Sequence, residues 1–277
     1  MPRAALARGT GTVIFEDSDM QFRDRTAVVV GGAGGIGLAV ADQLHDAGAQ
    51  VVTWDVLDGA DQHCDVAEPA SVRAAMSATL ALAGSPTLLV YSAGVTGHAA
   101  LADTTLDDWD RIMDINLRGA FLTLQAVGGA MIAAGQGGSI VLVSSTAATL
   151  ADPEMAPYSV SKAGINHLTK LAAIEWGAHG IRINSVAPGP TETRLMERSL
   201  SNEAYRDLVV ETTPLARVGT PELLADAIVH TLQMEWITGQ NIIADGGTSL
   251  VTPRGARRAA LGRFAAGAAP IDEGVRR

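Results

Sequence analysis

The hydrophobic positions of the chain fall into short apolar runs separated by longer segments of helical spacing. The apolar runs are rich in β-branched residues and predict strands at residues 26–30, 50–54, 87–91, 139–143, 181–187 and 241–244. Between the runs, apolar residues recur at helical spacing, as Ile36, Val40 and Leu44 do. This spacing predicts helices at about residues 35–47, 69–83, 106–134, 157–178 and 221–234.

Strands that alternate with helices predict one α/β domain. Runs such as TAVVV and SIVLV show no polar alternation, so helices are expected to cover both faces of the sheet. The predicted fold class is a single-domain Rossmann fold, a doubly wound parallel sheet with helices on both faces. The domain is expected to span residues 21–251. Residues 1–20 are interpreted as an irregular N-terminal extension, and residues 252–277 as a tail rich in Ala, Gly and Arg.

A glycine-rich turn follows the first predicted strand and leads directly into a helix. Such a turn lets backbone N–H groups and a helix N-terminus approach a pyrophosphate, which side chains would block. Two registers overlap here: Gly32, Gly34 and Gly37 fit G-x-G-x-x-G, whereas Gly31, Gly35 and Gly37 fit G-x-x-x-G-x-G. The glycines alone leave both registers open, and also a tight turn that binds no ligand.

An acidic residue, Asp55, ends the second predicted strand and lies 18 residues beyond Gly37. A carboxylate at this place accepts hydrogen bonds from the adenosine ribose hydroxyls and repels a 2′-phosphate. No Arg or Lys occurs between Arg25 and Arg73 to neutralise such a phosphate. The sequence therefore favours NAD over NADP, with an ordinary turn residue as the alternative for Asp55.

A tyrosine and a lysine four residues apart, Tyr158 and Lys162, share one face of a predicted helix. An ammonium beside a phenol stabilises the phenolate and lowers the tyrosine pKa from its ordinary value of about 10. The pair alone is a weak indication, because a solvated helix face has the same spacing. Ser144 and Ser145 end a predicted strand, where open α/β sheets bind ligands, so the combination indicates acid–base chemistry.

These motifs, taken in order, resemble the short-chain dehydrogenase/reductase family. Its pattern of TGxxxGxG, NNAG, a helix Asn, Ser, YxxxK and PG is matched by VGGAGGIG (30–37), YSAG (91–94), Asn116, Ser145, YSVSK (158–162) and Pro188-Gly189. The closing segment TGQNIIADGG (238–247) is also similar, and the resemblance covers residues 22–250. The chain departs from the pattern at Val30, where the family has Thr, and at Tyr91-Ser92, where it has two Asn.

The resemblance settles two choices that the residues left open. Ser145 precedes Tyr158 by 13 residues, which is the family's spacing and selects it over Ser144. The glycine register becomes Gly31, Gly35 and Gly37 by the same comparison.

The resemblance also implies a role for each matched residue. Tyr158 would be the general acid/base while hydride moves to or from a nicotinamide, and Ser145 would hold the substrate oxygen. Lys162 would lower the Tyr158 pKa and bind the nicotinamide ribose, and the backbone of Asn116 would hold a water that links Lys162 to solvent. The implied cofactor-binding residues are Gly31, Gly35, Ile36, Gly37, Asp55, Asp65, Val66, Ser92, Ala93, Gly94, Tyr158, Lys162, Pro188, Gly189, Thr191 and Thr193.

The substrate side is predicted from apolar residues. Residues 191–213 are expected to form a mobile lid, with ordinary core packing as the alternative. Their apolar content favours a mainly apolar alcohol or ketone as substrate. The candidate substrate contacts are His98, Ala147, Met155, Leu195 and Met196. The resemblance further implies a homotetramer, formed through the two long helices.

Composition restricts the remaining classes of partner. The 277 residues carry 30 acidic and 20 basic side chains, a net charge of −10, which disfavours nucleic acid and anionic membranes. The charge-free apolar stretch from Ala27 to Ala41 is shorter than the roughly 20 residues of a membrane span, so no membrane partner is expected. Cys64 is the only cysteine and no secretory signal is recognisable, which favours the cytoplasm. The histidines show no paired ligand spacing, so no metal site is expected.

Several functions compete on this basis. An NAD-dependent oxidoreductase that interconverts a secondary alcohol and a ketone is favoured. The nearest alternative is an enzyme similar to 3-oxoacyl carrier-protein reductases, although Asp55 disfavours NADPH and the net charge disfavours an acidic carrier protein. A non-catalytic NAD(H)-sensing regulator would not need the complete set of Ser145, Tyr158 and Lys162. A hydrolase is disfavoured because the chain has no G-x-S-x-G motif.

Overall fold

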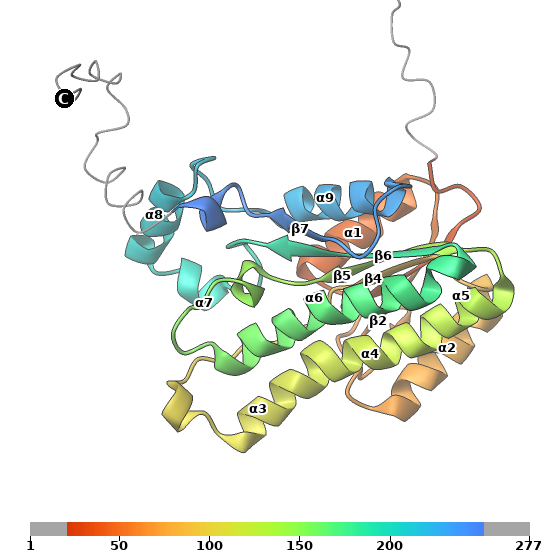
Figure 1. The fold of residues 1–277 in the computed structure, drawn as a ribbon, viewed down its shortest axis with the longest axis horizontal. Helices are drawn as coiled ribbons and strands as arrows, with labels where there is room; N and C mark the ends of the chain where they lie inside the picture. Colours follow the sequence, from red (N-terminus) through yellow and green to blue (C-terminus); the bar gives the residue numbers. More distant parts are fainter. Residues whose placement is uncertain (1–20, 252–277) are drawn as a thin grey trace, which may run out of the picture.

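The computed structural model describes residues 21–251, which form the domain shown in Figure 1. The predicted N-terminal extension (1–20) and C-terminal tail (252–277) lie outside the described residues. The core of the domain is one parallel sheet with helices on both faces, so the predicted fold class is confirmed.

The sheet has seven strands in the order β3-β2-β1-β4-β5-β6-β7, and each neighbouring pair is parallel. The strands are β1 (Thr26–Val30), β2 (Gln50–Asp55), β3 (Gln62–His63), β4 (Leu88–Tyr91), β5 (Gly138–Val143), β6 (Ile181–Pro188) and β7 (Asn241–Ala244). Six of them lie where the apolar runs predict strands. β3 was not predicted, because this two-residue edge strand pairs only with the end of β2 and carries no apolar run.

Outside residues 197–212, the helices lie where helical spacing predicts them. They are α1 (Gly35–Asp46), α2 (Pro69–Ala83), α3 (Leu106–Met113), α4 (Gly119–Thr123), α5 (Gly129–Ala134), α6 (Ala156–Trp176), α7 (Glu197–Leu200), α8 (Glu203–Thr212) and α9 (Pro221–Gln233). One buried cluster joins α1 and α9 to one face of the sheet. A larger cluster joins α2, α4, α5 and α6 to the opposite face, as Figure 1 shows.

The helix predicted at 106–134 is interrupted by two wide turns. Residues Asp114–Arg118 and Leu124–Gly128 each form a π-helical turn, in which the backbone hydrogen bonds reach five residues back instead of four. By length and composition this helical run could cross a membrane, a possibility that the Ala27 to Ala41 stretch did not reveal. Its inner side instead packs against α2, α6 and the core of the domain.

Parallel strands bring their carboxyl ends to one edge of the sheet. β1 runs into the glycine turn there, β2 ends at Asp55, and β5 is followed by Ser144 and Ser145. β6 ends at Pro188 on the same edge. The topology thus collects residues from across the sequence at the place where open α/β sheets bind ligands.

Candidate active site

The glycine turn after β1 leaves no room for a side chain at Gly31 or Gly37. A Cβ at Gly31, where φ is +76°, would lie 2.6 Å from the Ala93 amide nitrogen. A Cβ at Gly37 would lie 2.0 Å from the Gly31 carbonyl oxygen, whereas Gly34 faces open space. This geometry agrees with the register Gly31, Gly35 and Gly37, because Gly34 is not sterically required.

The N-terminus of α1 is open toward the same edge of the sheet. Gly34 is its N-cap and no side chain caps the helix, so its first N–H groups are free for another acceptor. Gly35 has a φ of +53°, and a Cβ built on it would lie 3.6 Å from the Thr193 methyl carbon. Gly35 and Thr193 also line a cavity of about 790 Å³. A bare helix N-terminus beside such a cavity fits the pyrophosphate of a dinucleotide.

Asp55 is held against the glycine turn by its own carboxylate. Its Oδ2 accepts a hydrogen bond from the Ala33 amide at 3.1 Å, and its Oδ1 accepts one from the Leu57 amide at 3.1 Å. Asp58 and Asp61 line a cavity of about 440 Å³ next to Ala33. The surroundings of this strand end are therefore acidic.

Ser145, Tyr158 and Lys162 are brought together between β5 and the first two turns of α6. The Ser145 hydroxyl accepts a hydrogen bond from the Ala147 amide at 3.1 Å. Burial raises the pKa of the Tyr158 phenol, and hydrogen bonding with Ser145 lowers it in part. The Lys162 Nζ lies 5.8 Å from the centre of the Tyr158 ring. The three residues predicted for proton transfer thus share one site.

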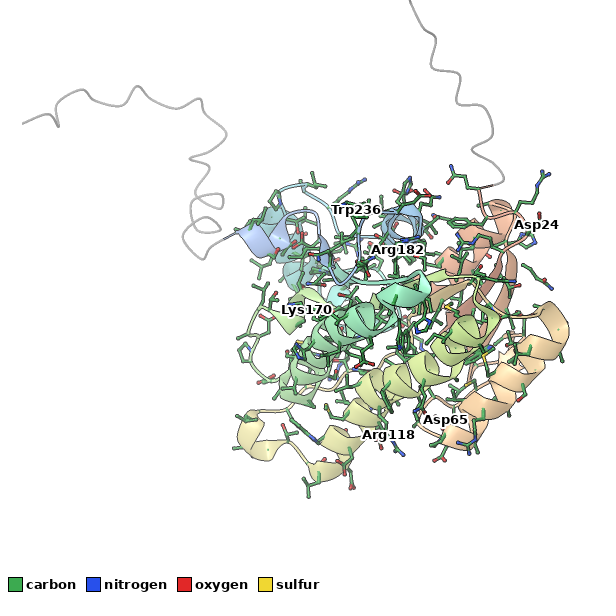
Figure 2. The ribbon with its side chains drawn as sticks, turned by 45° about the vertical axis from the view of Figure 1, so that its right-hand side comes forward. Asp24, Asp65, Arg118, Lys170, Arg182 and Trp236 are labelled. Atoms are coloured by element: carbon green, nitrogen blue, oxygen red, sulfur yellow. The ribbon has the colours of Figure 1, made fainter. Side chains whose placement is uncertain are left out.

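Lys162 is buried although its side chain can carry a positive charge. Its side chain is 4% exposed, and Nζ donates a hydrogen bond to the Val143 carbonyl at 2.9 Å. Burial lowers the pKa of Lys162 to about 8. The other lysine, Lys170, lies two turns further along α6 and is exposed (Figure 2), so only Lys162 belongs to the site.

Asn116 is buried in the first wide turn, and its side-chain amide forms three hydrogen bonds. Its Nδ2 donates to the Val95 carbonyl at 2.9 Å and to the Ser161 hydroxyl at 3.0 Å, while its Oδ1 accepts from the Val95 amide at 2.8 Å. The Ser161 hydroxyl in turn donates to the Tyr158 carbonyl at 2.7 Å. Asn116 therefore joins the loop after β4 to the helix that carries Tyr158. We call Asn116, Ser145, Tyr158 and Lys162 the catalytic cluster.

The remaining predicted cofactor residues lie around the same strand ends. Ser92 donates its amide to the Val30 carbonyl at 2.8 Å, which fixes the start of the Ser92-Ala93-Gly94 segment beside the glycine turn. Thr191 is buried, and its hydroxyl donates to the Gly189 carbonyl at 2.9 Å. Val66 is buried and packs in the core cluster.

The predicted substrate residues divide into two groups. Ala147 and Met155 pack against Tyr158, together with Ile112 and Val95, which the sequence did not single out. A signal for Ile112 was present, because it lies four residues before Asn116 on the same helix.

The other substrate candidates lie away from Tyr158 or in the open. His98 is exposed and Leu195 is 40% exposed. Met196 packs with Leu200, Val209 and Val218 in a small cluster within residues 191–218. The structure therefore brings only Ala147 and Met155 next to the phenol.

Metal-binding and thiol chemistry are not prominent in the described part of the chain. Within residues 21–251, no group of three or more His, Cys, Asp or Glu side chains is arranged to hold a metal ion. Cys64 is a free, buried thiol, and burial is the largest cause that raises its pKa to about 11.

Known proteins are similar to this chain over most of its length. Residues 31–249 match the family model described as enoyl-(acyl carrier protein) reductase. The D-threitol dehydrogenase of Mycolicibacterium smegmatis is 35% identical over 252 residues, which cover 84% of this chain and 96% of that protein. The gluconate 5-dehydrogenase of Gluconobacter oxydans is 33% identical, over 81% of this chain and 94% of that protein.

Solved structures show the same likeness. The crystal structure of a gluconate 5-dehydrogenase from Burkholderia cenocepacia, in complex with NADP and tartrate, superimposes with a TM-score of 0.80 and 33% identity. The match covers 84% of this chain and 98% of that chain. Together with the order of the motifs along one parallel sheet, these comparisons show that the chain belongs to the short-chain dehydrogenase/reductase family and is an oxidoreductase of the kind that acts on CH–OH groups.

Proposed function

We propose that the protein interconverts a secondary alcohol and a ketone with NAD, and that Tyr158 is its general acid/base. The observation that carries the proposal is the convergence of Ser145, Tyr158 and Lys162 in one site, at the edge of the sheet where α1 also begins. A regulator that only senses NAD(H) would need the glycine turn, but it would not need a buried lysine next to a buried tyrosine.

Each residue of the cluster has a part in moving one proton. When bound, the nicotinamide supplies the acceptor or donor of the hydride. The Tyr158 hydroxyl gives a proton to the substrate oxygen during reduction, and the Tyr158 phenolate accepts that proton during oxidation. Ser145 donates a hydrogen bond to the same oxygen and holds it near the phenol. Lys162, as an ammonium, stabilises the Tyr158 phenolate.

The choice of NAD rests on the charge around the end of β2. Asp55 is fixed at the glycine turn, with Asp58 and Asp61 around the adjoining cavity. The Asp55 carboxylate, which is bonded to the glycine turn, would repel a 2′-phosphate there. The Burkholderia gluconate 5-dehydrogenase was solved with NADP, so relatives of this fold are not uniform in cofactor.

The wall next to Tyr158 favours a substrate with an apolar portion. Ile112, Ala147, Val95 and Met155 form this wall. A second candidate function follows from the same wall, namely oxidation of a 3-hydroxyacyl thioester. The (3R)-3-hydroxyacyl-CoA dehydrogenase of Rattus norvegicus is 33% identical over 83% of this chain. Short polyols such as threitol are the contrasting class of substrate, because they have no apolar portion to contact this wall.

Exposed apolar residues on the long helices favour a homotetramer as the working form. Phe121 on α4 and Leu171 and Ile174 on α6 are 48%, 46% and 80% exposed. Burial of such side chains between copies would remove apolar surface from water. We place this oligomer in the cytoplasm, since the chain has a single cysteine, Cys64.

The test is NADH formation from NAD at alkaline pH with a panel of secondary alcohols, polyols, sugars and 3-hydroxyacyl thioesters. Turnover that disappears in Tyr158→Phe is the expected result and identifies the substrate class. Turnover that survives this substitution would refute the role of Tyr158. NADH that binds tightly without any turnover across the panel would favour the regulator.

A further inference from the structure

Tyr91 is a buried tyrosine next to the site that has no part in the proposed proton transfer. It ends β4, its side chain is 1% exposed, and its hydroxyl donates to the Ile115 carbonyl at 2.5 Å. Burial strongly raises the pKa of the Tyr91 phenol, so it keeps its proton and remains a hydrogen-bond donor.

The carbonyl that accepts this hydrogen bond belongs to the first wide turn, Asp114–Arg118. This turn is closed by the Gly119 amide, which bonds to the Asp114 carbonyl five residues back. A Cβ at Gly119 would lie 2.6 Å from the Tyr91 hydroxyl, so the glycine leaves the space that the hydroxyl fills. π-helical turns are frequent at functional sites, where they change the direction of nearby groups.

The wide turn presents Asn116, the residue directly after Ile115. Asn116 Oδ1 and Lys162 Nζ both face Gly94, at 3.4 and 3.5 Å from a Cβ built there. A shift of the turn would therefore move Asn116 relative to the ammonium of Lys162. Since Lys162 lies beside the Tyr158 ring, the path from the Tyr91 hydrogen bond to the acid–base group runs through Ile115, Asn116 and Lys162.

The second wide turn, Leu124–Gly128, is an internal comparison. In the described structure, no side chain donates a hydrogen bond to its carbonyls, and it contains none of the predicted site residues. This turn instead packs closely against α6, because a Cβ at Gly128 would lie 2.3 Å from the Trp176 ring. The turn that carries Asn116 thus accepts a hydrogen bond from a side chain, Tyr91, whereas the turn further from the site accepts none from the described side chains.

We propose that Tyr91 is a positioning residue, whose hydroxyl holds the wide turn Asp114–Arg118 in the geometry that places Asn116 beside Lys162. This inference rests on the proposed function of Tyr158. Tyr91 touches neither substrate nor cofactor in this proposal, and it acts on proton transfer without contributing to NADH affinity.

The test is Tyr91→Phe, which removes the hydroxyl and keeps the ring. The readout is the ionisation of Tyr158, followed by phenolate absorbance and isolated by subtracting the spectrum of Tyr158→Phe. We expect the midpoint to rise by about 0.5 to 1 pH unit, because a displaced Lys162 Nζ stabilises the phenolate less. In the turnover assay, kcat should fall about tenfold while NADH affinity, measured by fluorescence, stays unchanged.

The matched control is Thr123→Val. It also removes a buried hydroxyl from this helix, but the Thr123 hydroxyl has no hydrogen-bond partner among the described residues. The control should titrate and turn over like the unchanged protein. If Tyr91→Phe does not fold, Gly119→Ala displaces the same hydroxyl from the other side and should raise the Tyr158 midpoint.

Two results would overturn the proposal. One is a Tyr158 midpoint in Tyr91→Phe that equals that of the unchanged protein. The other is a loss of thermal stability and NADH affinity together with an unchanged pH profile, which would make Tyr91 a structural residue only. Because the titration needs no substrate, a lack of turnover in the unchanged protein would count against the proposed function and leave the Tyr91 proposal to be judged by its midpoint.

Discussion

The catalytic cluster and the segment 191–213, predicted to be a lid, both follow carboxyl ends of strands but differ in how they are held. In the cluster, Asn116 and Lys162 are buried, and their polar atoms bond to backbone from other elements. The lid segment consists of two short helices, α7 and α8, and most of its side chains are exposed. Its apolar residues pack largely on one another.

This difference separates the chemistry from the choice of substrate. A proton-transfer group must hold its geometry closely, and multiple buried hydrogen bonds provide that. A lid must open and close, which requires a segment of low local stability. Substitutions in the cluster should therefore change turnover, whereas those in the lid segment should change substrate capture.

Tyr158→Phe should give the largest loss. It removes the proton donor and keeps the ring, so turnover should fall by roughly a hundredfold to ten-thousandfold while NADH still binds. The measurements are kcat for the best alcohol of the panel and a fluorescence titration with NADH. If NADH affinity fell by the same factor as kcat, the cluster would act through cofactor binding and not through proton transfer. The assignment of turnover to the cluster and of substrate capture to the lid segment would then be wrong.

Lys162→Met should lower turnover by about a hundredfold, because the ammonium that supports the phenolate is lost. It should also change how stability depends on pH. The pKa of Lys162 is lowered from 10.5 to about 8 by burial, so the folded state binds the proton less well than the unfolded chain. The cost of burying the ammonium is present below about pH 8 and disappears as the pH rises toward 10.5.

Urea unfolding at about pH 7 and about pH 9.5 measures this effect. Over that window the unchanged protein should gain stability relative to Lys162→Met, on the order of 2 kcal/mol. The sign is the useful part, since a salt-bridged lysine with a raised pKa would lose stability over the same window. Parallel curves for the two proteins would contradict the burial of a charged Lys162.

Asp55→Ala should narrow the preference for NADH over NADPH by about tenfold, because the carboxylate that repels a 2′-phosphate is removed. The measurement is the ratio of kcat/KM for the two cofactors. Asp58→Ala is the control, since Asp58 lines the neighbouring cavity but accepts no hydrogen bond in the described part of the chain. An unchanged ratio in Asp55→Ala, or an equal change in Asp58→Ala, would place the selector elsewhere.

How far the sequence could predict these two regions follows from what each residue signals locally. α2 was predicted at its observed bounds, because helical spacing and Pro69 at its start mark it. Helical spacing paired Tyr158 with Lys162, whereas Ser145 was selected over Ser144 by the family's spacing to Tyr158. The wide turn at Asn116 could not be predicted, since it lies inside a continuous helical run and its hydrogen-bond partner Tyr91 lies in a distant strand.

The lid segment shows the same limit in another form. Met196 was predicted to contact substrate, but an apolar residue at helical spacing suits a substrate wall and a small core equally well. Here it packs on Leu200 and Val209. Only the three-dimensional contacts separate the two interpretations, because neither carries a distinct sequence pattern.

Arg206→Ala should have the smallest effect on stability and tests the lid side of the comparison. Arg206 forms an ion pair with Glu192 across the lid segment, and the two side chains are 45% and 41% exposed. An exposed pair of this kind contributes less than about 1 kcal/mol, so the thermal midpoint should hardly change. The pair nevertheless joins α8 to the residue before Thr193, so its loss should raise KM for the alcohol about twofold to fivefold with kcat little changed. Equal kcat and KM effects, or a thermal loss as large as that of a buried substitution, would show that the lid segment is held as firmly as the catalytic cluster.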